Sequence, residues 1–332
     1  MDNWLSYYYP STVVFVDDQQ AFLTAIKNRL PKQILALFYN DAATALNKIK
    51  TIGTSQHTEP QYFQEIVDDV ELDMSKNTEA YFNIKLGDIS KMSYNAQRFA
   101  EISVVIVDQM MPDLDGISFC RELINYPVKK IMLTASKDLS IATKAFNEGI
   151  IDFFLLKDSP DLISELLSEI KNKQMDYFYS LNDRTLGFSV KKIAPAIHNP
   201  NIYLFLQDKL KELNVEEFYL LDRYGSMLFV QHDGTPVTLA ILPGEVIENF
   251  AGIAQEHEET TIALSLSKKE KLLFFPKEID CMRPVKEWEA FLFDAKRLPQ
   301  TANLFYSLIT DTHSQPIDVH HLSPQKNYSQ LF

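Results

Sequence analysis

Short runs of apolar residues alternate with helical patterns along the first half of the chain. Apolar runs typical of strands buried on both faces occur at residues 13–16, 34–39, 102–107, 130–134 and 152–156. Apolar residues recur at helical spacing at residues 22–30, 41–50, 116–126, 139–148 and 160–177. This repeated alternation of strand and helix predicts an α/β fold, a doubly wound (βα)5 domain with a parallel sheet.

One polar stretch, at about residues 51–98, interrupts the alternation and shows no clear strand. Gln61–Asp69 and Thr78–Phe82 are weakly helical within it. Because a structureless loop of this length is improbable inside a compact domain, we interpret the stretch as an inserted subdomain or lid. A partly disordered segment is the alternative that the pattern leaves open.

The second half of the chain has a different pattern. Helices are predicted at residues 201–213 and 244–255, and strands at 217–221, 226–231, 236–242, 261–266 and 271–275. Asp233-Gly234 predicts a hairpin turn between the second and third of these strands. Residues 288–297 fit a strand or a helix, and a loose tail is expected from His313. The pattern predicts an α+β domain with an antiparallel sheet.

These patterns divide the chain into four parts. We expect an N-terminal arm at residues 1–12, the α/β domain with its insertion at 13–178, a linker at 179–200, and the α+β domain at 201–332.

Charge and composition narrow the possible partners and location. The net charge is −13, and neither half is basic, which disfavours nucleic acid as a partner. No apolar run is long enough to span a membrane, and Met1–Pro10 lacks the pattern of a signal peptide. Two cysteines far apart in the sequence favour a reducing compartment, so we expect a cytoplasmic protein without a membrane anchor.

Polar residues stand at the ends of four of the predicted parallel strands. Asp17 and Asp18 follow the first strand, Asp108 the third, Thr134 ends the fourth, and Lys157 follows the fifth. Ligands bind beyond the carboxyl ends of parallel strands, so these side chains should meet at one edge of the sheet. Three carboxylates repel one another unless a cation such as Mg²⁺ binds between them. A carboxylate can then attack phosphorus, while the lysine and the threonine hydroxyl contact phosphate oxygens.

The segments around these residues resemble the receiver domains of two-component response regulators. The resemblance is carried by VVFVDD, VVIVDQMMPDLDG, IMLTAS and DFFLLKD, and it covers about residues 13–178 apart from the insertion. It implies that Asp108 accepts a phosphoryl group from a histidine kinase. It also implies that Mg²⁺ is held by Asp17, Asp18, Asp108 and the backbone carbonyl of Met110, with Asp18 as a direct ligand.

The same resemblance assigns the remaining roles. Lys157 pairs with the phosphoryl group, and Thr134 and Phe154 occupy the hydroxyl and aromatic positions of the conformational switch. Two residues depart from the family pattern: Asp158 stands where a proline usually follows the lysine, and Met110 is apolar. Because Met110 cannot orient an attacking water molecule, we expect slow loss of phosphate from Asp108.

The resemblance also suggests what phosphorylation controls. We expect formation of a homodimer and regulation of an atypical output domain at 201–332, acting in gene expression or signalling, with quorum sensing among the candidate processes. No nucleophile–base pair suggests an enzyme in that domain. The alternative is that it binds a nucleotide, or binds nucleic acid through Lys268, Lys269 and Lys271.

Overall fold

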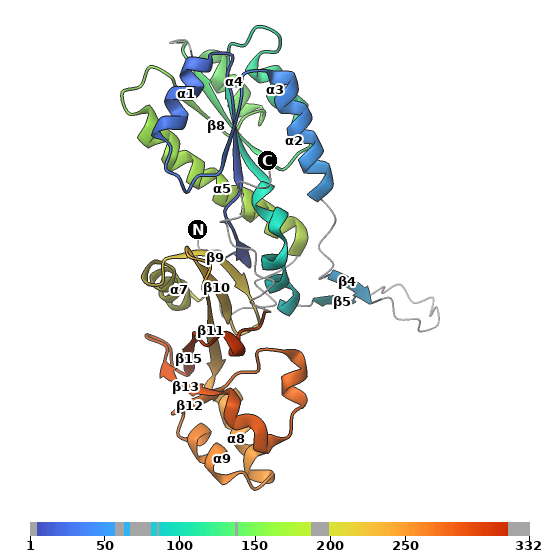
Figure 1. Cartoon of the computed structure of the whole chain (residues 1–332), viewed down its shortest axis with the longest axis vertical. Helices are drawn as coiled ribbons and strands as arrows, with labels where there is room; N and C mark the ends of the chain where they lie inside the picture. The colour runs from blue at the N-terminus through green and yellow to red at the C-terminus, as the bar shows by residue number, and fades with distance from the viewer. Residues whose placement is uncertain are drawn as a thin grey trace. The chain divides into compact units, whose positions relative to one another are not determined.

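The computed structural model describes residues 5–56, 63–66, 81–84, 86–136, 139–186 and 199–317 (Figure 1). These residues form two compact units, each built on its own sheet. The parallel-sheet unit contains described residues 10–56, 97–136 and 139–185. The antiparallel-sheet unit contains described residues 5–9, 63–66, 81–84, 86–96, 186 and 199–317.

The parallel-sheet unit has a five-stranded sheet in the order β3-β2-β6-β7-β8. Its strands are β2 (Thr12–Val16), β3 (Ala36–Tyr39), β6 (Ile102–Asp108), β7 (Lys129–Thr134) and β8 (Phe153–Leu156). Its helices are α1 (Gln20–Arg29), α2 (Ala42–Gln56), α3 (Gly116–Glu122), α4 (Ser140–Asn147) and α5 (Leu162–Leu186). The predicted (βα)5 parallel sheet is thus confirmed. The strand order reverses between β2 and β6, and this is the point at which doubly wound sheets bind ligands.

Both faces of this sheet are covered by helices, which explains why its strands are mainly apolar. Val13 and Phe15 of β2 belong to a hydrophobic cluster with residues of α1 and α5. Val14 and Val16 of the same strand belong to a second cluster with residues of α2, α3 and α4. Successive side chains of a strand point to opposite faces, so every position of β2 is buried.

The antiparallel-sheet unit has a six-stranded sheet in the order β1-β9-β10-β11-β15-β14. Its strands are β1 (Tyr7–Tyr8), β9 (Val215–Leu220), β10 (Met227–Gln231), β11 (Pro236–Pro243), β14 (Lys296–Arg297) and β15 (Leu304–Ile309). A separate antiparallel pair is formed by β12 (Lys271–Leu273) and β13 (Leu292–Asp294), and the α-helices are α7 (Pro200–Glu212), α8 (Gly244–Glu256) and α9 (Thr260–Ser267). The predicted α+β unit with an antiparallel sheet is also confirmed.

The described residues also form five 3-10 helices. They are η1 (Leu86–Tyr94), η2 (Ala96–Ala100), η4 (Glu278–Met282), η5 (Val285–Phe291) and η6 (Thr312–Ser314). The segment 288–297, which fits a strand or a helix by sequence, divides between η5 and the short strands β13 and β14. Within the described residues, no helix is both long enough and apolar enough to cross a membrane.

The N-terminal segment supplies an edge strand of the antiparallel sheet. Strand β1 pairs with β9, so that Tyr7 lies opposite Tyr219 and Tyr8 opposite Phe218. The backbone N–H of Leu220 also donates to the carbonyl of Ser6, at 2.6 Å. Residues 5–9 of the expected arm therefore belong to the same unit as residues 199–317, because backbone pairing with a distant strand satisfies their hydrogen bonds, whereas residues 10–12 belong to the parallel-sheet unit.

Two short strands lie within the stretch that interrupts the alternation. They are β4 (Phe63–Ile66) and β5 (Tyr81–Ile84), which pair in antiparallel register. The prediction of weak helices is therefore wrong at the described residues of these segments. Aromatic and β-branched residues at positions such as Phe63 and Ile84 favour strands, and pairing between the segments realises that preference. Of the expected linker, residues 187–198 lie outside the described residues, whereas α5 continues to Leu186.

Two further predictions in the second half are wrong. The segment 261–266 lies in helix α9, because Ile262, Ala263 and Leu266 share one helical face, which is buried in a hydrophobic cluster with α8. Tertiary packing here overrides the β preference of the local residues. Residues 313–317 are not a loose tail, because the Gln315 side chain accepts a hydrogen bond from Thr238 at 2.7 Å and is buried. The rest of the predicted tail lies outside the described residues.

Candidate functional site

The parallel strands bring the predicted site residues to one edge of the sheet. Asp108 is the last residue of β6, Asp17 follows β2, Thr134 ends β7, and Lys157 follows β8. The hydrogen bond from the Lys157 backbone N–H to the Thr134 carbonyl, at 2.8 Å, continues the pairing of β7 and β8 as far as these residues. Residues separated by 140 positions in the sequence therefore lie in one site.

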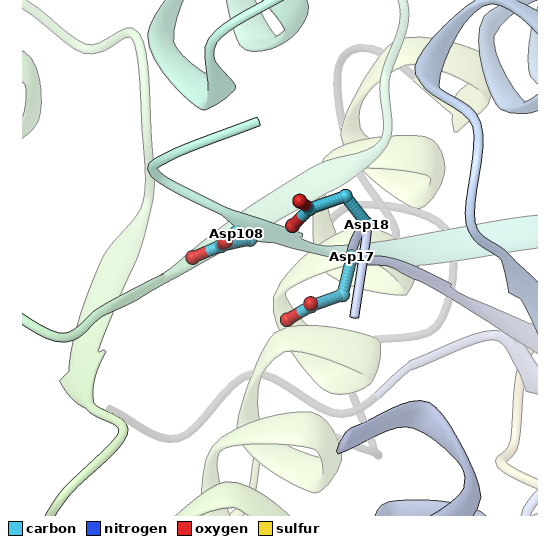
Figure 2. Close-up of side chains that lie close together, drawn as sticks. All are labelled: Asp17, Asp18 and Asp108. Atoms are coloured by element: carbon cyan, nitrogen blue, oxygen red, sulfur yellow. The ribbon is translucent and has the colours of Figure 1, made fainter. Parts of the chain in front are cut away.

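Three carboxylates gather where the strand order reverses. Asp17, Asp18 and Asp108 each offer an oxygen, and these oxygens lie within 4.8 Å of one another (Figure 2). Asp17 and Asp108 are buried, whereas Asp18 is exposed. The buried pair comes from adjacent central strands, and the exposed third carboxylate can reach a ligand that arrives from solvent.

Lys157 joins the two buried carboxylates. Its Nζ lies 2.6 Å from Oδ2 of Asp17 and 2.9 Å from Oδ1 of Asp108, and 9% of its side chain is exposed. One ammonium cannot balance three carboxylates, so the ionised site has an excess of negative charge. That excess and the hard oxygen donors fit a divalent cation such as Mg²⁺.

The Asp108 carboxyl is electrostatically perturbed. Burial raises its pKa above the ordinary value, and the nearby Asp17 carboxylate raises it further. The hydrogen bond and charge of Lys157 lower the pKa, as does a hydrogen bond from the backbone N–H of Met110, but burial prevails. A buried carboxylate that is only partly compensated is a group whose charge a cation or a phosphoryl transfer can relieve.

The loop between β6 and α3 follows the backbone of Asp108 closely. A Cβ atom at Gly116 would lie 2.2 Å from the carbonyl oxygen of Asp108, so this position requires glycine. The Gly116 N–H donates to the carbonyl of Gln109 at 3.0 Å, and Asp115 caps helix α3 by accepting from the N–H groups of Ile117 and Ser118. The DQMMPDLDG segment thus folds into a tight connection, from which the Met110 side chain projects with 72% of its surface exposed.

Thr134 and Phe154 lie on neighbouring strands. Thr134 is buried, and its Oγ1 accepts a hydrogen bond from the Ser136 backbone N–H at 3.0 Å. Phe154 pairs in register with Met132, two residues before Thr134, and packs partly buried against the cluster beneath α2, α3 and α4. The structure therefore places a hydroxyl beside the acidic site and an aromatic ring next to its strand.

One contact of the site was not predicted from the sequence. Phe22, in the first turn of α1, has its ring centroid 4.7 Å from Nζ of Lys157. The helical spacing of Phe22 indicates that it faces the sheet, but the sequence contains no signal that pairs it with a lysine 135 residues later.

The family comparison agrees with this geometry. Residues 72–168 match the model of the response regulator receiver domain. The matched range contains Asp108, Thr134 and Lys157, and it begins after α2, so Asp17 and Asp18 lie outside it. Residues 72–168 thus match a response regulator receiver domain, and the five-stranded parallel sheet of the unit that contains Asp108 is consistent with that fold.

The likeness to one solved structure extends over both units. The Legionella pneumophila response regulator LqsR matches with a TM-score of 0.76 and 26% identity, covering 98% of this chain and 95% of that chain. An adenylate cyclase from Rhodopirellula baltica matches with a TM-score of 0.36 and 19% identity, covering 54% of this chain and 99% of its own. The signal receiver domain of an HD domain-containing protein from Pseudomonas fluorescens matches with a TM-score of 0.34 and 20% identity, covering 52% of this chain and 98% of that chain. No curated protein matches the chain by sequence.

Proposed function

We propose that the chain is a phosphorylation-controlled response regulator, in which Asp108 accepts a phosphoryl group from the phosphohistidine of a histidine kinase. The observation that carries the proposal is the Lys157 ammonium, which contacts Asp17 and Asp108 together at the point where the strand order reverses. A purely structural ion pair would need one buried carboxylate beside the lysine, whereas here two buried carboxylates share it.

In the proposed transfer, an Asp108 carboxylate oxygen forms a bond to phosphorus. The bond between phosphorus and the kinase imidazole nitrogen breaks, and the imidazole keeps the electron pair. Asp17, Asp18, Asp108 and the backbone carbonyl of Met110 would hold Mg²⁺, which supplies positive charge against the phosphoryl oxygens. Lys157 contacts one phosphoryl oxygen and Thr134 donates its hydroxyl to another.

Movement of Thr134 toward the phosphoryl group would change the packing around Phe154 and with it the surface of α4 and β8. These two elements expose large apolar side chains: 51% of Ile141, 47% of Phe146 and 38% of Leu156. Exposed apolar residues on neighbouring elements support an interaction surface, and a homodimer formed on phosphorylation is the occupant we propose. Light scattering before and after phosphorylation tests this, and Phe146→Ser should weaken the dimer.

For the antiparallel-sheet unit we propose an interaction module without enzymatic activity. Two lysines of the candidate basic cluster are engaged in ion pairs: Lys269 lies 2.6 Å from Glu248, and Lys271 lies 2.6 Å from Asp294. These pairs and the acidic chain disfavour the nucleic-acid alternative. A salt-sensitive mobility shift of DNA by the full chain would reverse this preference, and a nucleotide-dependent rise in melting temperature would favour a nucleotide ligand.

A cytoplasmic location is part of the proposal. Its support is that the two cysteines of the chain, Cys120 and Cys281, lie far apart in the sequence, which favours a reducing compartment.

The test of phosphoacceptance uses acetyl phosphate and the full chain, read by intact mass. Wild type should gain the mass of one phosphoryl group in the presence of Mg²⁺ and not in the presence of a chelator. Asp108→Asn should gain none. The phosphorylated wild type should lose its phosphoryl group slowly, because Met110 cannot orient water, and decay within seconds would contradict that expectation.

A further inference from the structure

We propose that Phe22 is a positioning residue: its aromatic face holds the Lys157 ammonium at the acidic site and thereby sets the rate at which Asp108 is phosphorylated. The inference rests on the proposed function and adds a residue to it. The observation behind it is the distance of 4.7 Å between the Phe22 ring centroid and Nζ of Lys157.

The contact has the geometry of a cation–π interaction. An ammonium within about 6 Å of an aromatic centroid is attracted by the negative face of the ring, more strongly when it is shielded from water. The Lys157 side chain is 9% exposed, and its charge is shared between Asp17 and Asp108. The ring therefore covers an ammonium that water reaches poorly.

The loop that carries Asp17 also fixes the position of Phe22. The Gln19 backbone N–H donates to Oδ1 of Asp17 at 2.9 Å. The Phe22 backbone N–H donates to the carbonyl of Gln19, also at 2.9 Å. The ring belongs to a partly buried set that packs against the cluster of α1 and α5. Asp17, Gln19, Phe22 and Lys157 thus form a closed set of contacts. The carboxylate approaches the ammonium from the loop after β2, and the ring approaches it from the first turn of α1, which follows that loop.

An aromatic face suits this task because it attracts the ammonium without accepting its strong hydrogen bonds in competition with oxygen. Lysine has three N–H donors, and Asp17 and Asp108 take two of them. Within the part of the chain that the structure describes, no third acceptor contacts this ammonium, so the remaining donor can bind a phosphoryl oxygen. Without the ring, the flexible four-carbon side chain of Lys157 would gain rotamer freedom and hydration by moving out of the site. The attraction of the ring for the ammonium opposes this movement.

The first experiment measures the initial rate of phosphorylation of the full chain by acetyl phosphate with Mg²⁺, followed by intact mass. In this reaction the Asp108 oxygen bonds to phosphorus and acetate leaves with the electron pair of the broken P–O bond. Phe22→Leu should slow the reaction by about 2- to 30-fold, the range expected for a lost cation–π contact. Phe22→Tyr, which keeps the aromatic face, should restore most of the rate.

Two further variants separate the charge of the ring from its shape. Trifluorophenylalanine at position 22 keeps the shape of the ring but weakens its negative face, so it should be slow, as Phe22→Leu is. Phe38→Leu is the matched control, because Phe38 is another half-buried aromatic of this unit and its ring centroid lies 5.8 Å from Nζ of Lys27, which is not one of the acidic-site residues. It should react at the wild-type rate.

A second readout does not depend on phosphorylation. An amine-reactive reagent should modify Lys157 faster in Phe22→Leu than in wild type, as measured by peptide mass spectrometry. A wild-type rate of phosphorylation in Phe22→Leu, or in the fluorinated variant while Phe22→Leu is slow, would overturn the proposal. If wild type takes up no phosphoryl group but Lys157 is still labelled faster in Phe22→Leu than in wild type, the proposed function is wrong and the cation–π contact is supported. Equal rates of Lys157 labelling in Phe22→Leu and wild type would refute the contact itself.

Discussion

Replacing Lys157 with methionine removes the one positive charge that contacts both buried carboxylates of the acidic site. Methionine keeps most of the length of the side chain and its apolar stem, so the change mainly deletes the ammonium. Asp17 and Asp108, whose side chains are 2% and 4% exposed, would then lack their shared cation.

The expected loss follows from the burial of the pair. Removing one partner of a buried ion pair costs about 3–5 kcal/mol, because an uncompensated charge remains inside the protein. The matched control is Lys144→Met, since Lys144 has 75% of its side chain exposed and lies 3.8 Å from Glu148. Exposed helical pairs contribute about 0.3–0.5 kcal/mol, so the two variants should differ by several kcal/mol.

The loss at Lys157 should depend on pH with a defined sign. Burial already raises the pKa of Asp108, and Lys157 opposes that rise, so removing Lys157 raises the pKa further. A carboxyl with a raised pKa binds its proton more tightly in the folded than in the unfolded chain. Stability therefore falls as pH rises through the folded pKa, and acidification should reduce the penalty. Added Mg²⁺ should also reduce it, because a ligand of the folded state stabilises that state.

Hydrogen exchange of peptides from β6 and β8 measures this change, because a chain of two units need not unfold in one transition. Lys157→Met should exchange faster than wild type at neutral pH, and Mg²⁺ or mild acid should slow it toward wild type. The electrostatic explanation would be refuted if protection from exchange were lost equally at neutral and mildly acidic pH and if Mg²⁺ did not restore it. Packing would then be the cause.

Three other outcomes are expected. Gly116→Ala should lower the stability measured by hydrogen exchange by about 1–3 kcal/mol and should slow phosphorylation, because the new Cβ meets backbone atoms. The control is Gly149→Ala, where the backbone has a φ of 69° and the space around a Cβ is open. It should cost about 1–2 kcal/mol and leave phosphorylation unchanged. Asp115→Ala should cost about 1 kcal/mol at neutral pH, measured in the same way. Although burial acts to raise the pKa of Asp115, hydrogen bonds in the first turn of α3 lower it below the ordinary value. The contribution of Asp115 to stability is therefore lost as pH falls through the folded pKa, and a cost of the substitution that does not depend on pH would contradict this. Burial raises the pKa of the Cys120 thiol to about 12, so a thiol reagent at neutral pH should modify Cys281 alone in the native chain.

The parallel sheet could be predicted because its signals are local. The central strands β2 and β6 are short, mainly apolar runs that are buried at every position, and Asp17 and Asp108 stand at their ends. Parallel pairing alone then brings Asp17, Asp108 and Lys157 together, so spacing and strand direction sufficed for the acidic site.

Features that depend on distant partners were not predictable in this way. Strand β1 forms because Tyr7 meets Tyr219, and the packing of α9 against α8 outweighs the β preference of its residues. The Phe22–Lys157 contact likewise depends on side-chain positions that no periodicity encodes. In each case tertiary structure selects among conformations that the local sequence leaves similar in energy.

Locating the phosphoryl group on the chain shows directly whether Asp108 is the phosphoacceptor. Borohydride reduces an acyl phosphate of aspartate to homoserine, which tandem mass spectrometry identifies within a peptide. After reaction with acetyl phosphate and Mg²⁺, homoserine should be found at position 108 in wild type and nowhere in Asp108→Asn. Homoserine at another aspartate of the wild-type chain, or none at position 108 when the intact mass shows a phosphoryl group, would contradict the assignment of Asp108 as the phosphoacceptor.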